Sequence, residues 1–162
     1  MPDGPRPNGP RYDDDFYAWT QYQAKVLRSM RIEDNRFDRE NIVEEIETLG
    51  RSERDAVRSQ VRRILEHFLK LAYSPAAAPH YGWMRSIAET RAALGDKLST
   101  TLKRDARSRL NRLYDQAREH AALALQEHGE DTAAGLLPAV CPFTLARVLE
   151  DGWYPEPTEA PK

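Results

Sequence analysis

The feature that most constrains this chain is a proline-free stretch, residues 38–73, whose apolar residues recur at helical spacing. The apolar positions keep one phase throughout and are Ile42, Ile46, Leu49, Val57, Ile64, Phe68 and Leu71. A repeat of about 3.6 residues is typical of one face of an amphipathic helix. Pro75 disfavours helical backbone in the residue before it, so the pattern predicts a helix that ends near Tyr73.

Gly50 is the weak point of this predicted helix, because glycine costs about 1 kcal/mol relative to alanine inside a helix. Ser52 and Asp55 could begin a second helix there by capping its first turn. The apolar stripe nevertheless stays in phase across Gly50. We therefore favour one long helix, in which a kink is allowed.

Three further segments show the same periodicity, at residues 13–30, 83–98 and 102–124, and a short capped helix is expected over residues 144–149. No segment alternates as a strand does, and the connections are short. The predicted fold is all-α: an antiparallel four-helix bundle with a long second helix and a short C-terminal helix and tail.

Composition sets the predicted boundaries of the domain. Residues 1–11 hold four prolines and two glycines, too little apolar surface to offset the entropy of ordering them. We expect a disordered N-terminus over residues 1–11, a single helical-bundle domain over residues 12–155 and a disordered tail over residues 156–162.

Charge and cysteine content narrow the class of protein. The net charge of −2 argues against a generally basic nucleic-acid binder. The single cysteine, Cys141, excludes an internal disulfide and is expected to pack as a small apolar side chain. No apolar run approaches the roughly 20 residues of a membrane span, and no signal peptide is recognisable. We expect a cytoplasmic protein without membrane contact.

Five segments resemble, in order, the motifs of a mainly bacterial family known as domain of unknown function twenty-nine. They are residues 12–19 (YDDDFYAW), 40–53 (ENIVEEIETLGRSE), 65–70 (LEHFLK), Trp83 with Arg91, and 141–145 (CPFTL) with 153–155 (WYP). The resemblance covers about residues 12–155, and the second motif is its most distinctive part. It implies an all-helical bundle and brings no activity, ligand or catalytic residue.

A set of polar residues interrupts the apolar stripes. Glu53, Gln60 and His67 are spaced by seven in the second predicted helix, and Arg91 interrupts the third. The favoured interpretation is a structural ion pair between Arg91 and Glu53 that fixes helix register. The alternatives are a polar pocket that also includes Glu45, or a solvated helix edge.

Metal chemistry has weaker support. Glu44, Glu47 and Glu53 offer the oxygen ligands that magnesium prefers, but the third helix adds only Glu89 and Asp96. Glu and His are adjacent at residues 66–67 and 119–120, so they point to different helix faces. We expect no metal and no other cofactor.

Basic side chains are concentrated on two segments, at Arg58, Arg62, Arg104, Arg107, Arg109 and Arg112. Such a face suits an anionic partner, but no nucleic-acid-binding motif accompanies it. We favour an ordinary solvated surface. The large aromatic residues Trp19, Tyr73, Trp83, Tyr114 and Trp153 are interpreted as core anchors.

The sequence therefore predicts a non-enzymatic protein-interaction or regulatory module, with an unidentified protein partner and self-association allowed. A metal-assisted hydrolase acting on an anionic, nucleotide-like substrate is the alternative, through Glu44, Glu47 and Glu53. Nucleic-acid binding through the basic face is the second alternative.

Overall fold

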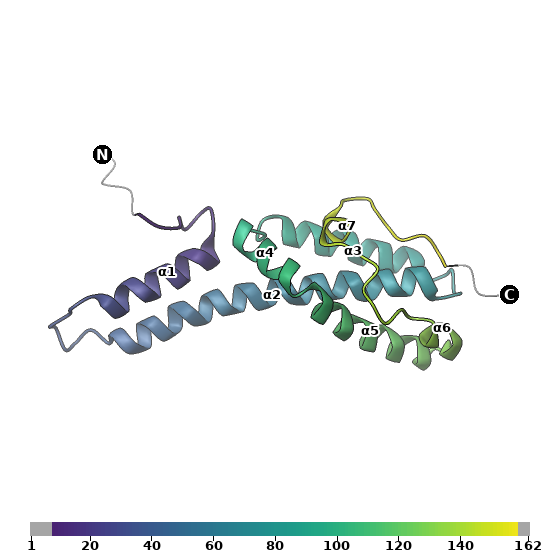
Figure 1. The fold of residues 1–162 in the computed structure, drawn as a ribbon, viewed down its shortest axis with the longest axis horizontal. Coiled ribbons are helices and arrows are strands. Elements are labelled where there is room, and N and C mark those ends of the chain that lie inside the picture. The colour runs from purple at the N-terminus through teal and green to yellow at the C-terminus, as the bar shows by residue number, and fades with distance from the viewer. Residues whose placement is uncertain (1–7, 159–162) are drawn as a thin grey trace. The chain divides into compact units, whose positions relative to one another are not determined.

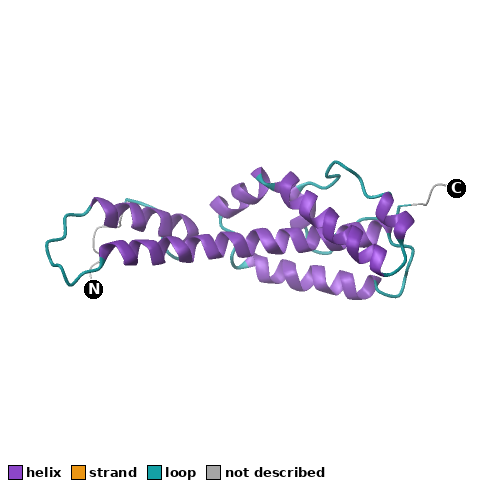
Figure 2. Cartoon of the chain, turned by 90° about the horizontal axis from the view of Figure 1, so that it is seen from below, coloured by secondary structure: helices purple, strands orange, loops and turns teal. Residues whose placement is uncertain are grey.

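The computed structural model describes residues 8–158, which form helices and loops without a strand (Figures 1 and 2). This confirms the predicted all-α class. Seven helices follow one another within this described range: α1 (Phe16–Ser29), α2 (Arg39–Tyr73), α3 (His80–Gly95), α4 (Thr100–Ser108), α5 (Leu110–Glu127), α6 (Asp131–Gly135) and α7 (Leu145–Leu149). Disorder is predicted at both ends of the chain, and residues 1–7 and 159–162 of those two segments lie outside the described residues.

The long second helix is unbroken, as the phase of its apolar stripe predicts. Asp38 lies just before it, and its Oδ1 accepts a hydrogen bond from the Asn41 N–H at 3.2 Å. At the start of α1, Asp15 accepts from the Ala18 N–H at 2.9 Å. Both contacts satisfy backbone donors that a first helical turn leaves without partners.

The chain divides into two compact units. Unit 1 comprises Met1–Ala56 and Leu98–Arg104, and unit 2 comprises Val57–Lys97 and Asp105–Lys162. The helices α2 and α4 each contribute residues to both units. The single domain expected over residues 12–155 stays a prediction.

In unit 1, Gly50 is the point where α2 meets α1. Gly50 is buried, and a Cβ atom there would collide with Thr20 Oγ1 and lie 3.2 Å from Thr20 Cβ. Thr20 is fully buried and donates its hydroxyl to Tyr17 O at 2.7 Å. The residue that looked like a weakness of the helix therefore permits the close approach of the two helices.

The core of unit 2 surrounds the C-terminal half of α2. Its fully buried large side chains are Val57, Val61, Ile64, Leu65, Phe68, Leu69, Ile87, Leu94, Tyr114 and Val148. Phe68 makes edge contacts with Phe143 at 5.1 Å and Trp153 at 5.2 Å between ring centroids. Burial raises the pKa of Tyr114, whose hydroxyl donates to Pro138 O at 2.6 Å.

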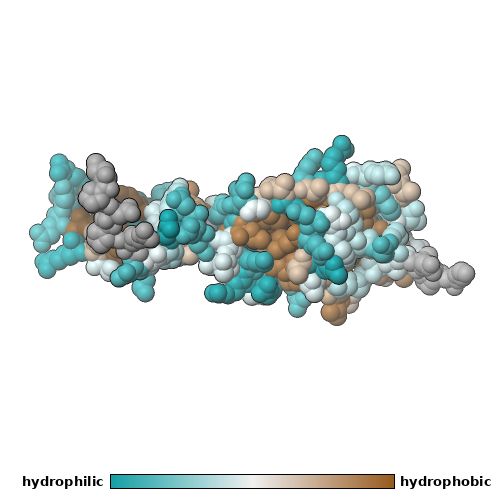
Figure 3. Space-filling view, turned by 90° about the horizontal axis from the view of Figure 1, so that it is seen from above, coloured by the Kyte–Doolittle hydropathy of each residue, from teal (hydrophilic) through white to brown (hydrophobic). Residues whose placement is uncertain are grey.

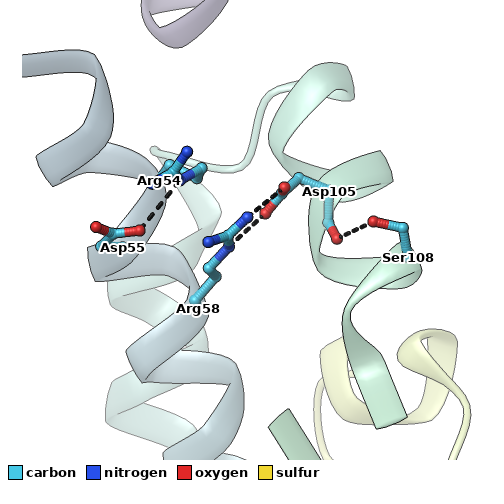
Figure 4. Close-up of polar contacts among 5 residues, drawn as sticks. All are labelled: Arg54, Asp55, Arg58, Asp105 and Ser108. Atoms are coloured by element: carbon cyan, nitrogen blue, oxygen red, sulfur yellow. Dashed lines mark hydrogen bonds and ion pairs between the residues drawn. The ribbon is translucent and has the colours of Figure 1, made fainter. Parts of the chain in front are cut away.

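The fourth predicted helix is wrong as a single element, because it divides into α4 and α5 at Arg109. Near this break the Ser108 hydroxyl donates to the Asp105 carbonyl at 2.8 Å (Figure 4). The periodicity also did not predict α6, which packs on α5.

The C-terminal segment of unit 2 folds back over the helices, and Figure 1 shows it in yellow beyond α7. Thr144 caps α7 by accepting from the Arg147 N–H at 3.3 Å, as its position predicts. Further on, Thr158 N–H donates to Ala72 O at 2.6 Å. This bond ties the end of the described chain to the end of α2.

Apolar side chains also reach the surface, where Figure 3 shows brown areas separated by hydrophilic side chains on the face drawn. The most exposed of them are Tyr81 and Val140, with 84% and 78% of their surface accessible. Single exposed apolar residues are ordinary and need no partner to explain them. Within the described range, no helix combines the length and the apolar character needed to cross a membrane.

Candidate functional site

The strongest candidate site is an apolar pocket in unit 2, with a volume of about 380 Å³. It lies among the end of α2, the α2–α3 linker, α3 and the end of α5. Its lining consists of Lys70, Ala76, Ala78, Pro79, Trp83, Ala124, Leu125, His128 and Glu130. Binding pockets for small groups typically have this size range, with apolar walls and a few polar atoms.

The wall from the linker lies between two prolines, Pro75 and Pro79, which interrupt the helical backbone. Ser74 Oγ accepts from the Ala76 N–H at 3.2 Å, which turns the chain after α2. Pro79 then precedes the first turn of α3, where Trp83 N–H donates to Pro79 O at 3.1 Å. The small side chains of the linker leave open space beside the Trp83 indole.

The opposite wall depends on a glycine. Gly129 has φ +74°, a left-handed conformation that favours glycine, and it ends α5. Its N–H donates to Gln126 O at 2.9 Å, and the next N–H, of Glu130, donates to Leu125 O at 2.9 Å. This helix-ending turn brings Glu130 back to the pocket.

The polar atoms of the pocket are unequally satisfied. Lys70 Nζ lies 2.5 Å from Glu66 Oε1, and Glu66 Oε2 lies 3.8 Å from His120 Nδ1. In contrast, Glu130 Oε2 is buried and has no hydrogen-bond partner among the described residues. The pocket is therefore lined by a neutralised cation and by Glu130, whose Oε2 is inaccessible to solvent.

Arg91 from the predicted polar set is buried in unit 2 and anchors the C-terminal segment. Its Nε donates to Val148 O at 2.9 Å and its Nη2 to Arg147 O at 3.1 Å. The guanidinium carbon lies 5.5 Å from the Phe68 ring centroid and 5.6 Å from that of Tyr154. Burial lowers the pKa of Arg91. These contacts give Arg91 a structural role in holding α7 against α3.

Gln60 and His67, also from that set, lie on the part of α2 that belongs to unit 2. Gln60 Oε1 and both ring nitrogens of His67 are buried, without hydrogen-bond partners in the described part of the chain. Burial, reinforced by the charge of Lys70, lowers the pKa of His67 to about 4. The ring is therefore neutral at physiological pH.

The acidic candidates lie in unit 1. Glu44 and Glu45 are exposed, and Glu53 is half-buried. Both oxygens of Glu47 accept from Arg28, at 2.5 and 2.8 Å, and this pairing lowers the pKa of Glu47. No cluster of three or more His, Cys, Asp or Glu side chains suited to a metal occurs in residues 8–158.

The basic candidates are divided between the units. Arg58 forms two 2.7 Å hydrogen bonds with the Asp105 carboxylate in unit 2 (Figure 4). Arg104 belongs to unit 1. Arg62 is half-buried, and the exposed members in unit 2 are Arg107, Arg109 and Arg112. The polar-pocket, metal and anionic-partner interpretations stay predictions.

Sequence reasoning missed the apolar pocket. Trp83 was interpreted as a core anchor, and it is only half-buried. Two signals were available: the run of alanines and prolines at residues 75–79, and alanine at 124 near the end of a helix. Both mark places where side chains are too small to fill the space beside a neighbouring aromatic residue.

Comparison with known proteins supports the helical class. The family described as "Domain of unknown function DUF29" matches residues 11–154. A solved structure of an α-helical protein of unknown function from Rhodospirillum rubrum superposes with a TM-score of 0.75 at 28% sequence identity. That alignment covers 88% of this chain and 91% of the other. None of the curated proteins compared with the chain matches it.

Proposed function

The chain belongs to the DUF29 family of unknown function, and we propose that it is a non-enzymatic protein-interaction module whose binding site is the apolar pocket of unit 2. In this proposal a partner polypeptide inserts one side chain beside Trp83. The observation that carries the proposal is a pocket of about 380 Å³ with mostly apolar walls.

Packing supports this interpretation of the pocket. Protein interiors are close-packed, and a wall without atoms opposite it loses dispersion contacts. An inserted side chain would restore those contacts and remove the Trp83 indole from water. Buried aromatic residues in such pockets commonly supply much of the binding energy at interfaces.

The two alternative functions have weaker support, although Glu44 and Glu47 line a second pocket, of about 630 Å³, in unit 1. The hydrolase hypothesis depends on Glu47, whose carboxylate is held by Arg28. The nucleic-acid hypothesis includes Arg58, which is paired with Asp105. Self-association and a cytoplasmic location, both expected from the sequence, likewise stay predictions.

The experiment is a selection of peptide binders from a displayed random library, followed by measurement of their affinity for two variants. Ala124→Trp places a large side chain in the pocket, whereas Leu123→Trp adds the same group at a neighbouring position that is 61% exposed and does not line it. We expect Ala124→Trp to weaken peptide binding at least about 30-fold, because the new indole and the partner's side chain cannot occupy the pocket together. Leu123→Trp should bind as the wild type does.

Circular dichroism and thermal unfolding check that both variants are folded. A library that yields no binders, or binders that tolerate Ala124→Trp, would contradict the proposed function.

A further inference from the structure

Resting on that proposed function, we infer that the side chain accepted by the pocket is an uncharged aromatic ring of the partner polypeptide, packed against the Trp83 indole. The first observation concerns charge. Lys70 Nζ lies 2.5 Å from Glu66 Oε1, and these two side chains are only 11% and 19% exposed. Glu66 therefore neutralises the cation in the lining of the pocket.

The other polar lining residues offer little to a charged group. Glu130 Oε2 has almost no accessible surface, so an entering group does not reach it. His128 Nδ1 already lies 2.8 Å from Ala124 O. A charged side chain between mostly apolar walls would lose its water and gain little in return, a cost that an uncharged side chain avoids.

The size of the pocket favours a ring over a smaller apolar side chain. The space of about 380 Å³ is bounded partly by Ala76, Ala78 and Ala124, whose side chains are too short to fill it. Aromatic side chains bury about 150–250 Å² each and are the largest apolar side chains. A smaller aliphatic side chain would leave wall atoms without neighbours and forfeit their dispersion contacts.

The Trp83 indole gives an incoming ring its partner. Trp83 lines the pocket, is half-buried, and contacts the His80 ring at 5.5 Å between centroids, with the ring planes 37° apart. An incoming ring would extend this pair to three rings. Unit 2 already contains such a set in its core, where Phe68 contacts both Phe143 and Trp153. Aromatic pairs attract one another beyond the effect of the area they bury, which an aliphatic side chain does not reproduce.

The test compares N-acetyl-phenylalanine-methylamide with N-acetyl-cyclohexylalanine-methylamide, which keeps the six-carbon ring and lacks its aromatic character. Binding is followed in nuclear magnetic resonance titrations through the backbone N–H signals of His128 and Glu130, which line the pocket. We expect the phenylalanine derivative to bind about 3–10-fold more tightly, the scale of one aromatic pair. N-acetyl-lysine-methylamide should bind more weakly than the phenylalanine derivative.

Trp83→Leu should abolish the preference for the phenylalanine derivative, because the ring in the wall is gone. Trp83→Phe keeps a ring and should keep the preference, which separates loss of the ring from damage to the wall. Tyr81→Leu is the matched control: it removes an aromatic side chain that is 84% exposed and does not line the pocket, so it should also keep the preference. Circular dichroism checks that the three variants are folded.

The failures of the two proposals are distinguishable. The inference of an uncharged aromatic ring is overturned if the cyclohexylalanine or the lysine derivative binds as tightly as the phenylalanine derivative, or if none of the three binds. It is also overturned if Trp83→Leu keeps the preference. In each of these cases the proposed function stands as long as selected peptides still need an unfilled pocket. A failed peptide selection overturns the proposed function and, with it, a polypeptide as the source of the ring.

Discussion

The two units of this chain solve the packing of helices in opposite ways. In unit 1, α1 and α2 approach closely through Gly50 and Thr20, and the buried apolar side chains from α1 and α2 are only Ala24 and Val43. In unit 2, large side chains such as Phe68 and Tyr114 form the core, and a pocket opens at its edge. Unit 1 contains a polar pocket of about 630 Å³ lined by charged side chains of α1 and α2, such as Arg28 and Glu44, whereas the pocket of unit 2 has mostly apolar walls.

The difference also extends to buried charge. Unit 2 buries the guanidinium of Arg91 against backbone carbonyls, while the Arg28–Glu47 pair of unit 1 is at the surface, with Arg28 58% exposed. Polar contacts should therefore contribute more to stability in unit 2. Contacts between small residues, such as Gly50 with Thr20, should contribute more to stability in unit 1.

The largest effect is expected from Arg91→Ala in unit 2. It leaves the carbonyls of Arg147 and Val148 without their donor and the rings of Phe68 and Tyr154 without their cation. We expect a loss of about 3–4 kcal/mol in the free energy of unfolding, measured by urea denaturation.

The exposed Arg85→Ala on the same helix is the control for Arg91→Ala and should change stability by less than about 0.5 kcal/mol. Limited proteolysis should cut the Arg91→Ala variant near α7. Equal stability of the two variants would remove the anchoring role of Arg91.

The second effect tests the close contact in unit 1. Gly50→Ala gains helix propensity but drives a methyl group into Thr20, so we expect a net loss of about 1–3 kcal/mol. Gly82→Ala, inside α3 with no atom within 4 Å of the added Cβ, should instead gain about 0.5–1 kcal/mol. Hydrogen exchange of the α1 amides should accelerate in Gly50→Ala and not in Gly82→Ala. If the two substitutions changed the free energy of unfolding in the same direction, the close contact at Gly50 would be contradicted.

The third effect concerns pH and His67. Because its pKa falls from 6.5 to about 4 on folding, the unfolded chain binds a proton more readily than the folded one between these values. Stability should be full above about pH 6.5 and decline as the pH falls toward 4. Screening of the half-buried ring limits this loss to about 1–2 kcal/mol.

His67→Gln cannot titrate, so its stability should decline less between pH 6.5 and 4 than that of the wild type in parallel urea titrations. Identical slopes for the two proteins would show that His67 makes no contribution.

The smallest expected effect on stability comes from breaking one ion pair in each unit. Arg58→Gln breaks the bidentate contact with Asp105, whose side chain is 22% exposed, and should cost about 1 kcal/mol. Arg28→Gln breaks the surface pair with Glu47 and should leave the unfolding midpoint unchanged. A larger loss from Arg28→Gln than from Arg58→Gln would invert the proposed difference between the units.

Local pattern was sufficient to predict much of the fold. The unbroken α2 follows from the phase of its apolar residues across Gly50, and the cap at Thr144 follows from side-chain chemistry. The break between α4 and α5 was missed because the apolar stripe continues across it. The backbone at Arg109, with φ −104° and ψ 3°, departs from the helix there, and the side-chain pattern carries no sign of it.

The site was harder to predict because its parts come from separate segments. Sequence reasoning paired Arg91 with a carboxylate, but the structure gives it the carbonyls of α7, and backbone acceptors have no sequence signature. The pocket likewise depends on a linker of small residues meeting the turn at Gly129. Neither segment shows a ligand-binding motif by itself.

The most direct test of the central claim uses the tryptophans as reporters, with Trp19 in unit 1 and Trp83 and Trp153 in unit 2. A selected peptide is titrated into the ¹⁵N-labelled protein while the three indole N–H signals are recorded. We expect the Trp83 signal to shift and saturate, and the Trp19 signal to stay in place. A saturating shift of Trp19 with an unchanged Trp83 would locate binding in unit 1 and contradict the account.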